Sequence, residues 1–249
     1  MTLEVREVSK RYGANTALFP ISLAFENKRT TVLLGQSGCG KSTLIRMLMG
    51  LVWPDSGRVL VDGETLEPKR VLEMRRRMGY VIQEGGLFPH LSARDNVLLL
   101  PRFLNREREA ATYLDELVAL TKLPGDALDR YPAQLSGGQR QRVSLMRALI
   151  LKPKYLLLDE PMGALDPMIR ADLQADLKNI FKVLGKTVVL VTHDLAEAAF
   201  LADEIVMLRN GRIVQSGTFM ALTTEPKDEY VARFINSQRL MPAGAETYA

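Results

Sequence analysis

Apolar and polar residues alternate over the first quarter of the chain, as half-buried strands require. Apolar residues recur between polar neighbours in 3–8, and large apolar residues alternate with small ones in 21–25. The segment 58–61 is similar and runs into Asp62-Gly63, a pair that favours a tight turn. These segments predict antiparallel strands with one buried face at the N-terminal end of the chain.

Three later runs are apolar or β-branched at almost every position, and they lie at 31–34, 155–158 and 187–191. Strands buried on both faces have this composition, which is typical of a parallel sheet covered by helices. Near the end of the chain, 204–208 and 212–214 flank an Asn-Gly pair and predict a hairpin.

Between Arg94 and Leu151 the apolar residues change to helical spacing. One apolar stripe beside charged positions consists of Tyr113, Leu114, Leu117, Val118 and Leu120. We therefore expect a helical subdomain at about 84–152, inserted into a single domain of 1–240. The remaining 241–249 is expected to be a flexible tail.

The composition is that of an ordinary globular protein, with 249 residues, 47% of them hydrophobic and 25% charged. No apolar run approaches the roughly 20 residues of a membrane-spanning helix, and the N-terminus has no basic segment followed by an apolar one. A single cysteine excludes an internal disulfide and a cysteine-cluster metal site. A scattered net charge of +4 does not predict nucleic-acid binding. The expected location is the cytoplasm.

The segment Gly35-Gln36-Ser37-Gly38-Cys39-Gly40-Lys41-Ser42 separates the apolar run ending at Leu34 from a helical run starting at Thr43. A strand, a glycine-rich loop and a helix in this order form the context of a phosphate-binding loop. Glycines let backbone amides turn toward phosphate oxygens, and the helix N-terminus adds positive potential. Lys41 is expected to reach the terminal phosphates, and the Ser42 hydroxyl is expected to bind Mg²⁺.

Cys39 inside this loop has two interpretations. A helix start and a nearby lysine lower a thiol pKa, which favours a reactive cysteine that a maleimide modifies unless ATP protects it. The preferred interpretation is that Cys39 is simply small enough to fit the loop.

Polar residues follow two of the buried runs. Asp159 and Glu160 end the run at 155–158, at the edge where open parallel sheets bind ligands. Asp159 is expected to bind Mg²⁺, and Glu160 is expected to orient and polarise the attacking water. His193 follows another buried run and is expected to contact the γ-phosphate; the alternative is a hydrogen-bonded core histidine. Asp194 is expected to start a helix.

A second glycine-rich segment, Leu135-Ser136-Gly137-Gly138-Gln139, resembles the signature of ABC ATPases. The whole chain has that family's motifs in order, and these are Tyr12, the loop from Gly35 to Thr43, Gln83, the signature, Asp159-Glu160, Ala164-Leu165-Asp166 and His193. The resemblance implies an α/β fold with a P-loop NTPase (RecA-like) core of mainly parallel sheet, an N-terminal antiparallel β-subdomain and an inserted α-helical subdomain. It also implies ATP and Mg²⁺ as cofactors.

The resemblance implies further residue roles. Tyr12 stacks on adenine, and Gln83 senses Mg²⁺ and the attacking water while linking to the helical subdomain. The signature residues Ser136, Gly137, Gly138 and Gln139 bind the γ-phosphate of nucleotide held by a second ATPase subunit, and Asp166 lies at that junction. Two composite sites then need two chains, and the expected pair is a homodimer.

More narrowly, 78–90 and 163–167 resemble the ATPases of glycine betaine, choline and related osmoprotectant importers. Polar amino-acid importers are an alternative, and a soluble ABC ATPase acting on a macromolecule is disfavoured because no long coiled coil or zinc-type cysteine cluster occurs. The implied partners are membrane permease subunits, docked near Leu87 and Phe88 at the inner membrane face, and indirectly an external solute-binding protein. Many osmoprotectant ATPases continue into a paired regulatory domain, whereas this chain stops shortly after Asn236.

Overall fold

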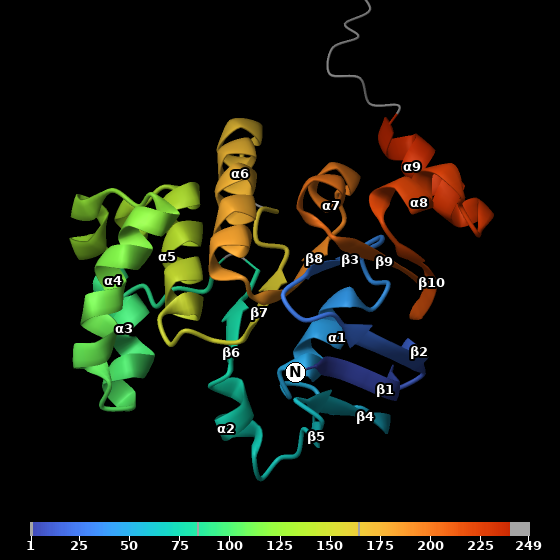
Figure 1. Cartoon of the computed structure of the whole chain (residues 1–249), viewed down its shortest axis with the longest axis horizontal. Helices are drawn as coiled ribbons and strands as arrows, with labels where there is room; N and C mark the ends of the chain where they lie inside the picture. The colour runs from blue at the N-terminus through green and yellow to red at the C-terminus, as the bar shows by residue number, and fades with distance from the viewer. Residues whose placement is uncertain (1, 84, 164, 240–249) are drawn as a thin grey trace, which may run out of the picture.

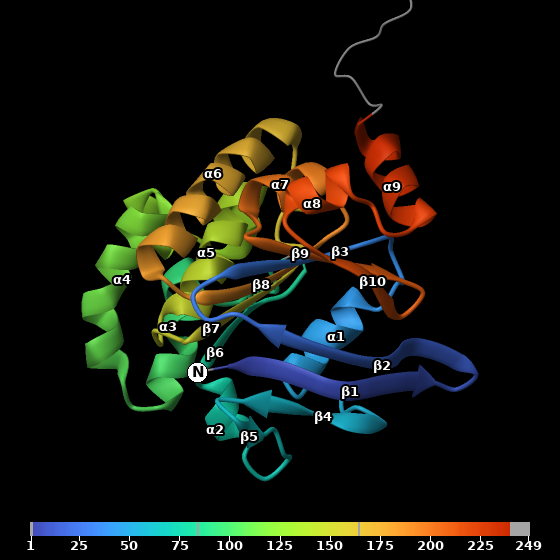
Figure 2. The same cartoon turned by 45° about the vertical axis from the view of Figure 1, so that its right-hand side comes forward.

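The computed structural model describes residues 2–83, 85–163 and 165–239. Within them, the strands form a four-stranded sheet of order β2-β1-β4-β5 and a six-stranded sheet of order β10-β9-β3-β8-β7-β6. The two sheets lie with α1 (Lys41–Leu48) between them, and the helices of residues 93–149 gather beside β6, at one end of the larger sheet (Figures 1 and 2). The expected α/β architecture is confirmed.

The smaller sheet is antiparallel, as its alternating pattern predicts. Its strands are β1 (Leu3–Tyr12), β2 (Asn15–Phe25), β4 (Ser56–Val61) and β5 (Glu64–Thr65). In β1 the buried positions are Leu3, Val5 and Val8, and Leu3 pairs with Phe25 on one side and Val61 on the other. The apolar face of this sheet therefore turns toward the rest of the molecule.

The larger sheet is mainly parallel. Its strands are β3 (Thr30–Leu34), β6 (Met78–Val81), β7 (Tyr155–Asp159), β8 (Thr187–Thr192), β9 (Glu204–Arg209) and β10 (Arg212–Gly217), of which only β10 runs antiparallel to its neighbour. Leu34 pairs with Thr192, and Asp159 pairs with Val191. The carboxyl ends of β3, β7 and β8 therefore meet at one edge, and the three predicted polar segments follow them.

Side chains on the two faces of the larger sheet enter two different cores. In β3, Val32 and Leu34 belong to one core while Leu33 belongs to the other. The helix α1 (Lys41–Leu48) fills the second core between the sheets with Leu44, Ile45, Met47 and Leu48. Every residue of 30–34 is buried, so cover on both faces of the sheet explains why this run is apolar or β-branched throughout.

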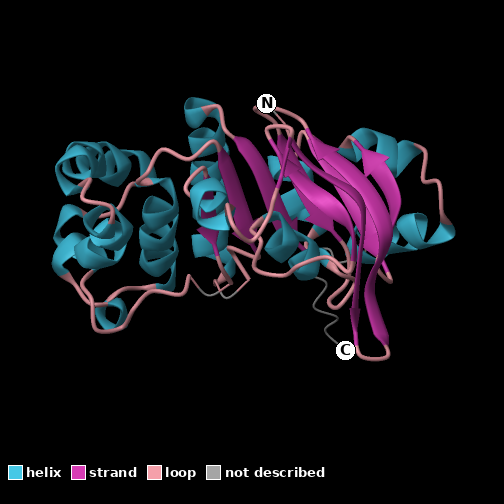
Figure 3. Cartoon of the chain, turned by 90° about the horizontal axis from the view of Figure 1, so that it is seen from below, coloured by secondary structure: helices cyan, strands magenta, loops and turns pink. Residues whose placement is uncertain are grey.

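The helical subdomain stands apart from the strands (Figure 3). It consists of α3 (Ala93–Phe103), α4 (Glu107–Thr121), the 3₁₀ turns η1 (Gly125–Asp129) and η2 (Pro132–Gln134), and α5 (Gly137–Leu149). The predicted stripe of α4 packs inward: Tyr113, Leu114 and Leu117 are buried, and Val118 and Leu120 pack against the same core. All these elements fall inside the range 84–152.

Helices also cover the face of the larger sheet opposite α1. They include α6 (Pro167–Leu184) and α7 (Leu195–Leu201), which begins after Asp194 as expected. Four of the described helices have no counterpart among the sequence predictions, namely α6, α2 (Val71–Arg75), α8 (Phe219–Thr224) and α9 (Glu229–Arg239). In the part of the chain that the structure describes, no helix is long and apolar enough to cross a membrane. The expected tail at 241–249 lies outside the described residues.

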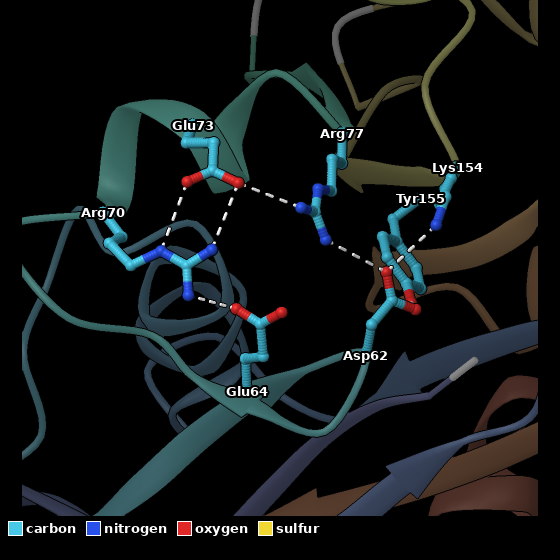
Figure 4. A network of polar contacts seen from close by, with 7 residues as sticks. All are labelled: Asp62, Glu64, Arg70, Glu73, Arg77, Lys154 and Tyr155. Carbon is cyan, nitrogen blue, oxygen red and sulfur yellow. Dashed lines mark hydrogen bonds and ion pairs between the residues drawn. The ribbon is translucent and has the colours of Figure 1, made fainter.

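A network of charged side chains ties the smaller sheet to β7 and to α2 (Figure 4). Asp62, at the turn after β4, accepts hydrogen bonds from the Tyr155 hydroxyl at 2.7 Å and from Lys154 at 3.1 Å. Its partner Arg77 continues the network to Glu73. Burial alone raises the pKa of Asp62, but the hydrogen bonds from Tyr155 and Lys154, together with the charges of Lys154 and Arg77, outweigh it and hold the pKa below its ordinary value.

We expect Asp62→Asn to lower the free energy of unfolding by about 1 kcal/mol at neutral pH, because Tyr155 and Lys154 lose a charged acceptor. The carboxyl has a lowered pKa in the folded chain, so its stabilisation is present above the unfolded pKa of about 4 and is lost as pH falls through the folded value. Urea unfolding of both proteins at neutral and acidic pH measures the difference. Glu64→Gln, at the exposed end of the network, is the control and should change little; a difference that persists in acid contradicts this account.

Candidate active site

The phosphate loop is a tight backbone turn between β3 and α1. Gly40 has φ +108° and stands where α1 begins. A Cβ at this position would lie 2.6 Å from Leu18 Cδ2 and 2.7 Å from the Ala17 carbonyl oxygen. Only glycine therefore fits, because β2 packs directly against the loop.

Lys41 is held inside the loop rather than in solvent. Its side chain is buried, and its Nζ donates to the carbonyl oxygens of Gly35 at 2.7 Å and Gln36 at 3.0 Å. A buried ammonium group needs such acceptors because it has lost its water. The amine is thus placed at the helix N-terminus, where an anion would be attracted.

The loop opens onto a cavity of about 640 Å³. Predicted site residues on its wall are Ser37, Gly38, Gly40, Lys41, Ser42, Thr43, Gln83 and Glu160. Residues from three separated segments therefore meet there, as the alignment of strand ends requires.

Asp159 lies at the base of this site. Its carboxylate is almost fully buried, accepts a hydrogen bond from the Ser42 hydroxyl at 3.0 Å, and lies 4.0 Å from the Arg46 guanidinium. Burial raises the pKa of Asp159, and the Ser42 hydrogen bond and the charge of Arg46 only partly offset this effect. Tyr80 donates a longer bond of 3.4 Å, and burial together with the Asp159 charge raises the pKa of Tyr80 to about 12.

Glu160 and His193 face each other at the edge of the sheet. His193 Nδ1 lies 3.4 Å from Glu160 Oε2. The Glu160 backbone has φ +46°, an unfavourable region for a residue with a side chain, and its N–H donates to Val191 O at 3.1 Å. The interpretation of His193 as a core histidine is wrong, because its side chain is 54% exposed.

Gln83 reaches the cavity from the end of β6, and the chain just after it is attached to α5. Ser144 Oγ donates to Gly85 O at 2.9 Å, and the Arg147 guanidinium donates to the carbonyl oxygens of Gly85 and Gly86, each at 2.8 Å. Residue 84 lies outside the described residues. These bonds attach the segment that follows Gln83 to the helical subdomain.

The signature segment forms the start of α5, away from the cavity of the phosphate loop. Ser136 caps the helix by accepting a hydrogen bond from the Gln139 N–H at 3.2 Å, while Gln139 Oε1 accepts from the Ser136 N–H at 2.9 Å. Gly138 packs so closely on α6 that a Cβ would lie 2.7 Å from Ile169. Ser136 itself is exposed, so this helix start is open to an outside anion.

Asp166 caps the neighbouring helix. Its carboxylate accepts a hydrogen bond from the Ile169 N–H at 3.0 Å at the start of α6. The preceding Leu165 would touch a Cβ placed on Gly137, so Asp166 and the signature lie on adjoining helix starts. Ala164 lies outside the described residues.

Tyr12 does not line the cavity. It is half exposed at the end of β1, with Lys10 Nζ 5.6 Å from its ring centre. The wall on that side comes from residues that the sequence reading missed, namely Asn15, Thr16, Ala17, Phe19, Asn210 and Gly211. None of them belongs to a nucleotide-binding motif, and the Asn210-Gly211 pair predicted only a hairpin turn. The Gly211 N–H donates to Cys39 O at 3.0 Å and the Phe19 N–H donates to Gly211 O at 2.9 Å, and these bonds hold the β9–β10 turn against the loop and β2.

Cys39 is buried at 5% exposure, and its preferred interpretation as a small residue that fits the loop agrees with the structure. Burial raises the pKa of its thiol, and the charge of Lys41 lowers it by less. The burial of the thiol and its raised pKa both argue against the reactive-cysteine interpretation.

Comparison with known proteins identifies close relatives. The model of the ABC transporter family matches residues 18–163. The chain is 44% identical over 239 residues to the glycine betaine uptake system ATP-binding protein YehX of Escherichia coli, which covers 96% of this chain and 78% of that protein. It is 43% identical over 241 residues to the glycine betaine/carnitine/choline transport ATP-binding protein OpuCA of Bacillus subtilis, covering 96% of this chain but only 63% of that longer protein.

Solved structures of ABC cassettes have the same fold as this chain. The dimeric bacterial ABC transporter cassette MJ0796 has a TM-score of 0.77 at 31% identity, with 87% of this chain and 98% of that chain covered. The same cassette in a post-hydrolysis state bound to ADP and Pi has a TM-score of 0.76. The family match over 146 positions, the relatives and the shared fold confirm the resemblance read from the motifs, and the chain belongs to the ABC transporter family.

Proposed function

We propose that this chain is the ATP-hydrolysing subunit of an ABC importer for an osmoprotectant such as glycine betaine or choline. The observation that carries the proposal is the convergence of Lys41, the Ser42–Asp159 pair and the Glu160–His193 pair on the carboxyl ends of three parallel strands. Phosphoryl transfer depends mainly on positioning and charge compensation, and these groups can supply both.

Each group has a role in hydrolysis. The loop amides, Lys41 and Thr43 hold the phosphates, and the cavity wall that includes Phe19 receives the nucleoside. Tyr12 adds an aromatic face for adenine beside this wall. Glu160 accepts a hydrogen bond from the attacking water and polarises it. His193 steadies the γ-phosphate and the water from the opposite side, and Gln83 orients the same water.

Ser42 and Asp159 fit a Mg²⁺ ion. A hydroxyl and a carboxylate 3.0 Å apart are hard oxygen ligands, and a divalent cation would offset the burial that raises the pKa of Asp159. Gln83 is the third candidate ligand on the cavity wall. When bound, Mg²⁺ supplies positive charge against the phosphate oxygens.

The working unit is a pair of subunits. Ser136, Gly137, Gly138 and Gln139 begin a helix that is separate from the phosphate loop of the same chain, so their anion site needs nucleotide held by a second copy. Asp166 lies beside them. The dimeric structure of the similar cassette supports a pair of subunits. In this proposal the pair is head-to-tail, and ATP joins its two composite sites.

The membrane partner is a permease at the inner face of the cell membrane, served by an external solute-binding protein. The candidate docking residues are the exposed apolar side chains within 84–152, namely Phe88, which follows Gln83 by five positions, and Leu99, Leu100 and Phe103 of α3. The names of the relatives favour glycine betaine, choline and carnitine over polar amino acids as solutes.

Glu160→Gln tests the shared-site mechanism. We expect kcat for ATP hydrolysis to fall by about 100-fold or more, because an amide cannot polarise water as a carboxylate does. The unhydrolysed ATP should then trap a dimer that light scattering detects with Mg-ATP, while wild type stays mainly monomeric. Adding Ser136→Arg to this variant should abolish the trapped dimer. A dimer that persists in the double variant, or full hydrolysis by Glu160→Gln, contradicts the mechanism.

Phe88→Ala tests permease docking. The Phe88 backbone is held by Asn96, which accepts from its N–H at 2.8 Å and donates to its carbonyl at 3.1 Å, so removal of the exposed ring should leave the loop folded. We expect unchanged ATP binding and a loss of transport-coupled ATPase in the reconstituted complex. Met220→Ala, equally apolar but on α8, is the control. Full coupling in Phe88→Ala places the docking surface elsewhere.

Uptake measurements test the solute. Cells that lack this chain should lose high-affinity uptake of radiolabelled glycine betaine or choline under hyperosmotic stress and keep uptake of glutamine. The wild-type gene restores uptake, and the Glu160→Gln gene does not. Loss of glutamine uptake alone assigns the chain to a polar amino-acid importer.

A further inference from the structure

Gln238, near the end of α9, forms two hydrogen bonds with the main chain that follows β8. Its Oε1 accepts from the Leu195 N–H at 2.6 Å, and its Nε2 donates to the His193 carbonyl oxygen at 2.9 Å. The partners lie 43 and 45 positions apart in the sequence. One side-chain amide therefore holds the backbone on both sides of Asp194.

These bonds complete the start of α7. The first N–H groups of a helix have no partner within the helix. Asp194 accepts from two of them, Ala196 N–H at 2.7 Å and Glu197 N–H at 3.1 Å. The Leu195 N–H needs an acceptor from outside, and Gln238 provides it. The backbone position of His193 therefore depends on a residue of the C-terminal helix.

The helix that carries Gln238 is firmly attached. Tyr230, Val231, Phe234 and Ile235 of α9 are buried in the core that also contains Leu195, Ala198 and Leu201 of α7. Beyond this core, the two helices enclose an open hollow of about 730 Å³ whose lining includes His193, Phe200 and Gln238. Water can enter the hollow, so the backbone groups would be solvated if the amide were removed. Loss of the Gln238 amide should therefore change the position of the His193 backbone more than it lowers the stability of the fold.

We infer that Gln238 is a positioning residue that sets the place of His193 opposite Glu160. The inference rests on the role proposed above for His193, whose Nδ1 lies 3.4 Å from Glu160 Oε2. Half of the His193 side chain is exposed, so packing does little to fix the imidazole and the backbone must do so. Displacements of about 1 Å at a reacting group reduce rates strongly.

The test is the steady-state ATPase of the full chain carrying Gln238→Ala. We expect kcat to fall by about 10-fold while KM for ATP stays unchanged, because Gln238 positions His193 without lining the nucleotide cavity. The kcat of Gln238→Glu should fall by the same factor, since a carboxylate cannot donate a hydrogen bond to the His193 carbonyl oxygen. Asn236→Ala removes an exposed amide of the same helix that, among the described residues, makes no bond to 193–195, and it should retain wild-type kcat.

A double variant separates positioning from general damage. In a His193→Ala background, assayed by single-turnover hydrolysis, Gln238→Ala should cause no further loss, because the group that it positions is gone. An equal loss in both backgrounds, a wild-type kcat in Gln238→Ala, or a loss shared by Asn236→Ala overturns the inference. Full activity of His193→Ala by itself instead overturns the proposed role of His193.

Discussion

The parallel register of β3, β7 and β8 places most groups of the proposed catalytic site, and Gln83 follows the neighbouring strand β6. Because Leu34 pairs with Thr192 and Asp159 pairs with Val191, the strands end within one residue of each other. The phosphate loop, the acid pair and His193 begin where the ladder stops, so their separation is set by the spacing of neighbouring strands. A one-residue slip of β7 would turn Asp159 to the opposite face of the sheet.

The helix α5, itself part of the helical subdomain, connects the rest of that subdomain to this edge of the sheet. Ser136 caps its N-terminus. Ser144 and Arg147, farther along the helix, donate hydrogen bonds to the carbonyl oxygens of Gly85 and Gly86. Arg142 forms an ion pair with the buried Asp176 of α6 at 2.6 Å. Breaking a buried pair of this kind is costly, because it leaves an unpaired charge. The signature, the segment after Gln83 and α6 are therefore joined through one rigid element.

Much of the fold follows from the local sequence. Each sequence pattern indicates which faces of an element become buried. The two sheets and the helical subdomain could therefore be predicted from the alternating segments, the apolar runs and the helical stripe. The helix α9 could have been found from the apolar spacing of Val231, Phe234 and Ile235. Phe19 and Asn210 could not, because they join the cavity only through long-range pairing of β2 with the β9–β10 turn. Gln238 also acts through a long-range contact, so no sequence motif identifies it. The sequence places Cys39 next to Lys41, but it does not show that burial has the larger effect on the pKa of the thiol.

As the N-cap of α5, Ser136 can both accept a hydrogen bond within the helix and donate one to an outside group. Its oxygen accepts the hydrogen bond that starts the helix, which leaves the hydroxyl proton to be donated to a second acceptor. An acceptor-only group such as a phosphate oxygen matches that free proton, whereas a donor such as an ammonium does not. The folding of this helix and the proposed recognition of a partner's nucleotide would therefore share a single atom, so a residue that cannot both accept and donate at this position would impair both.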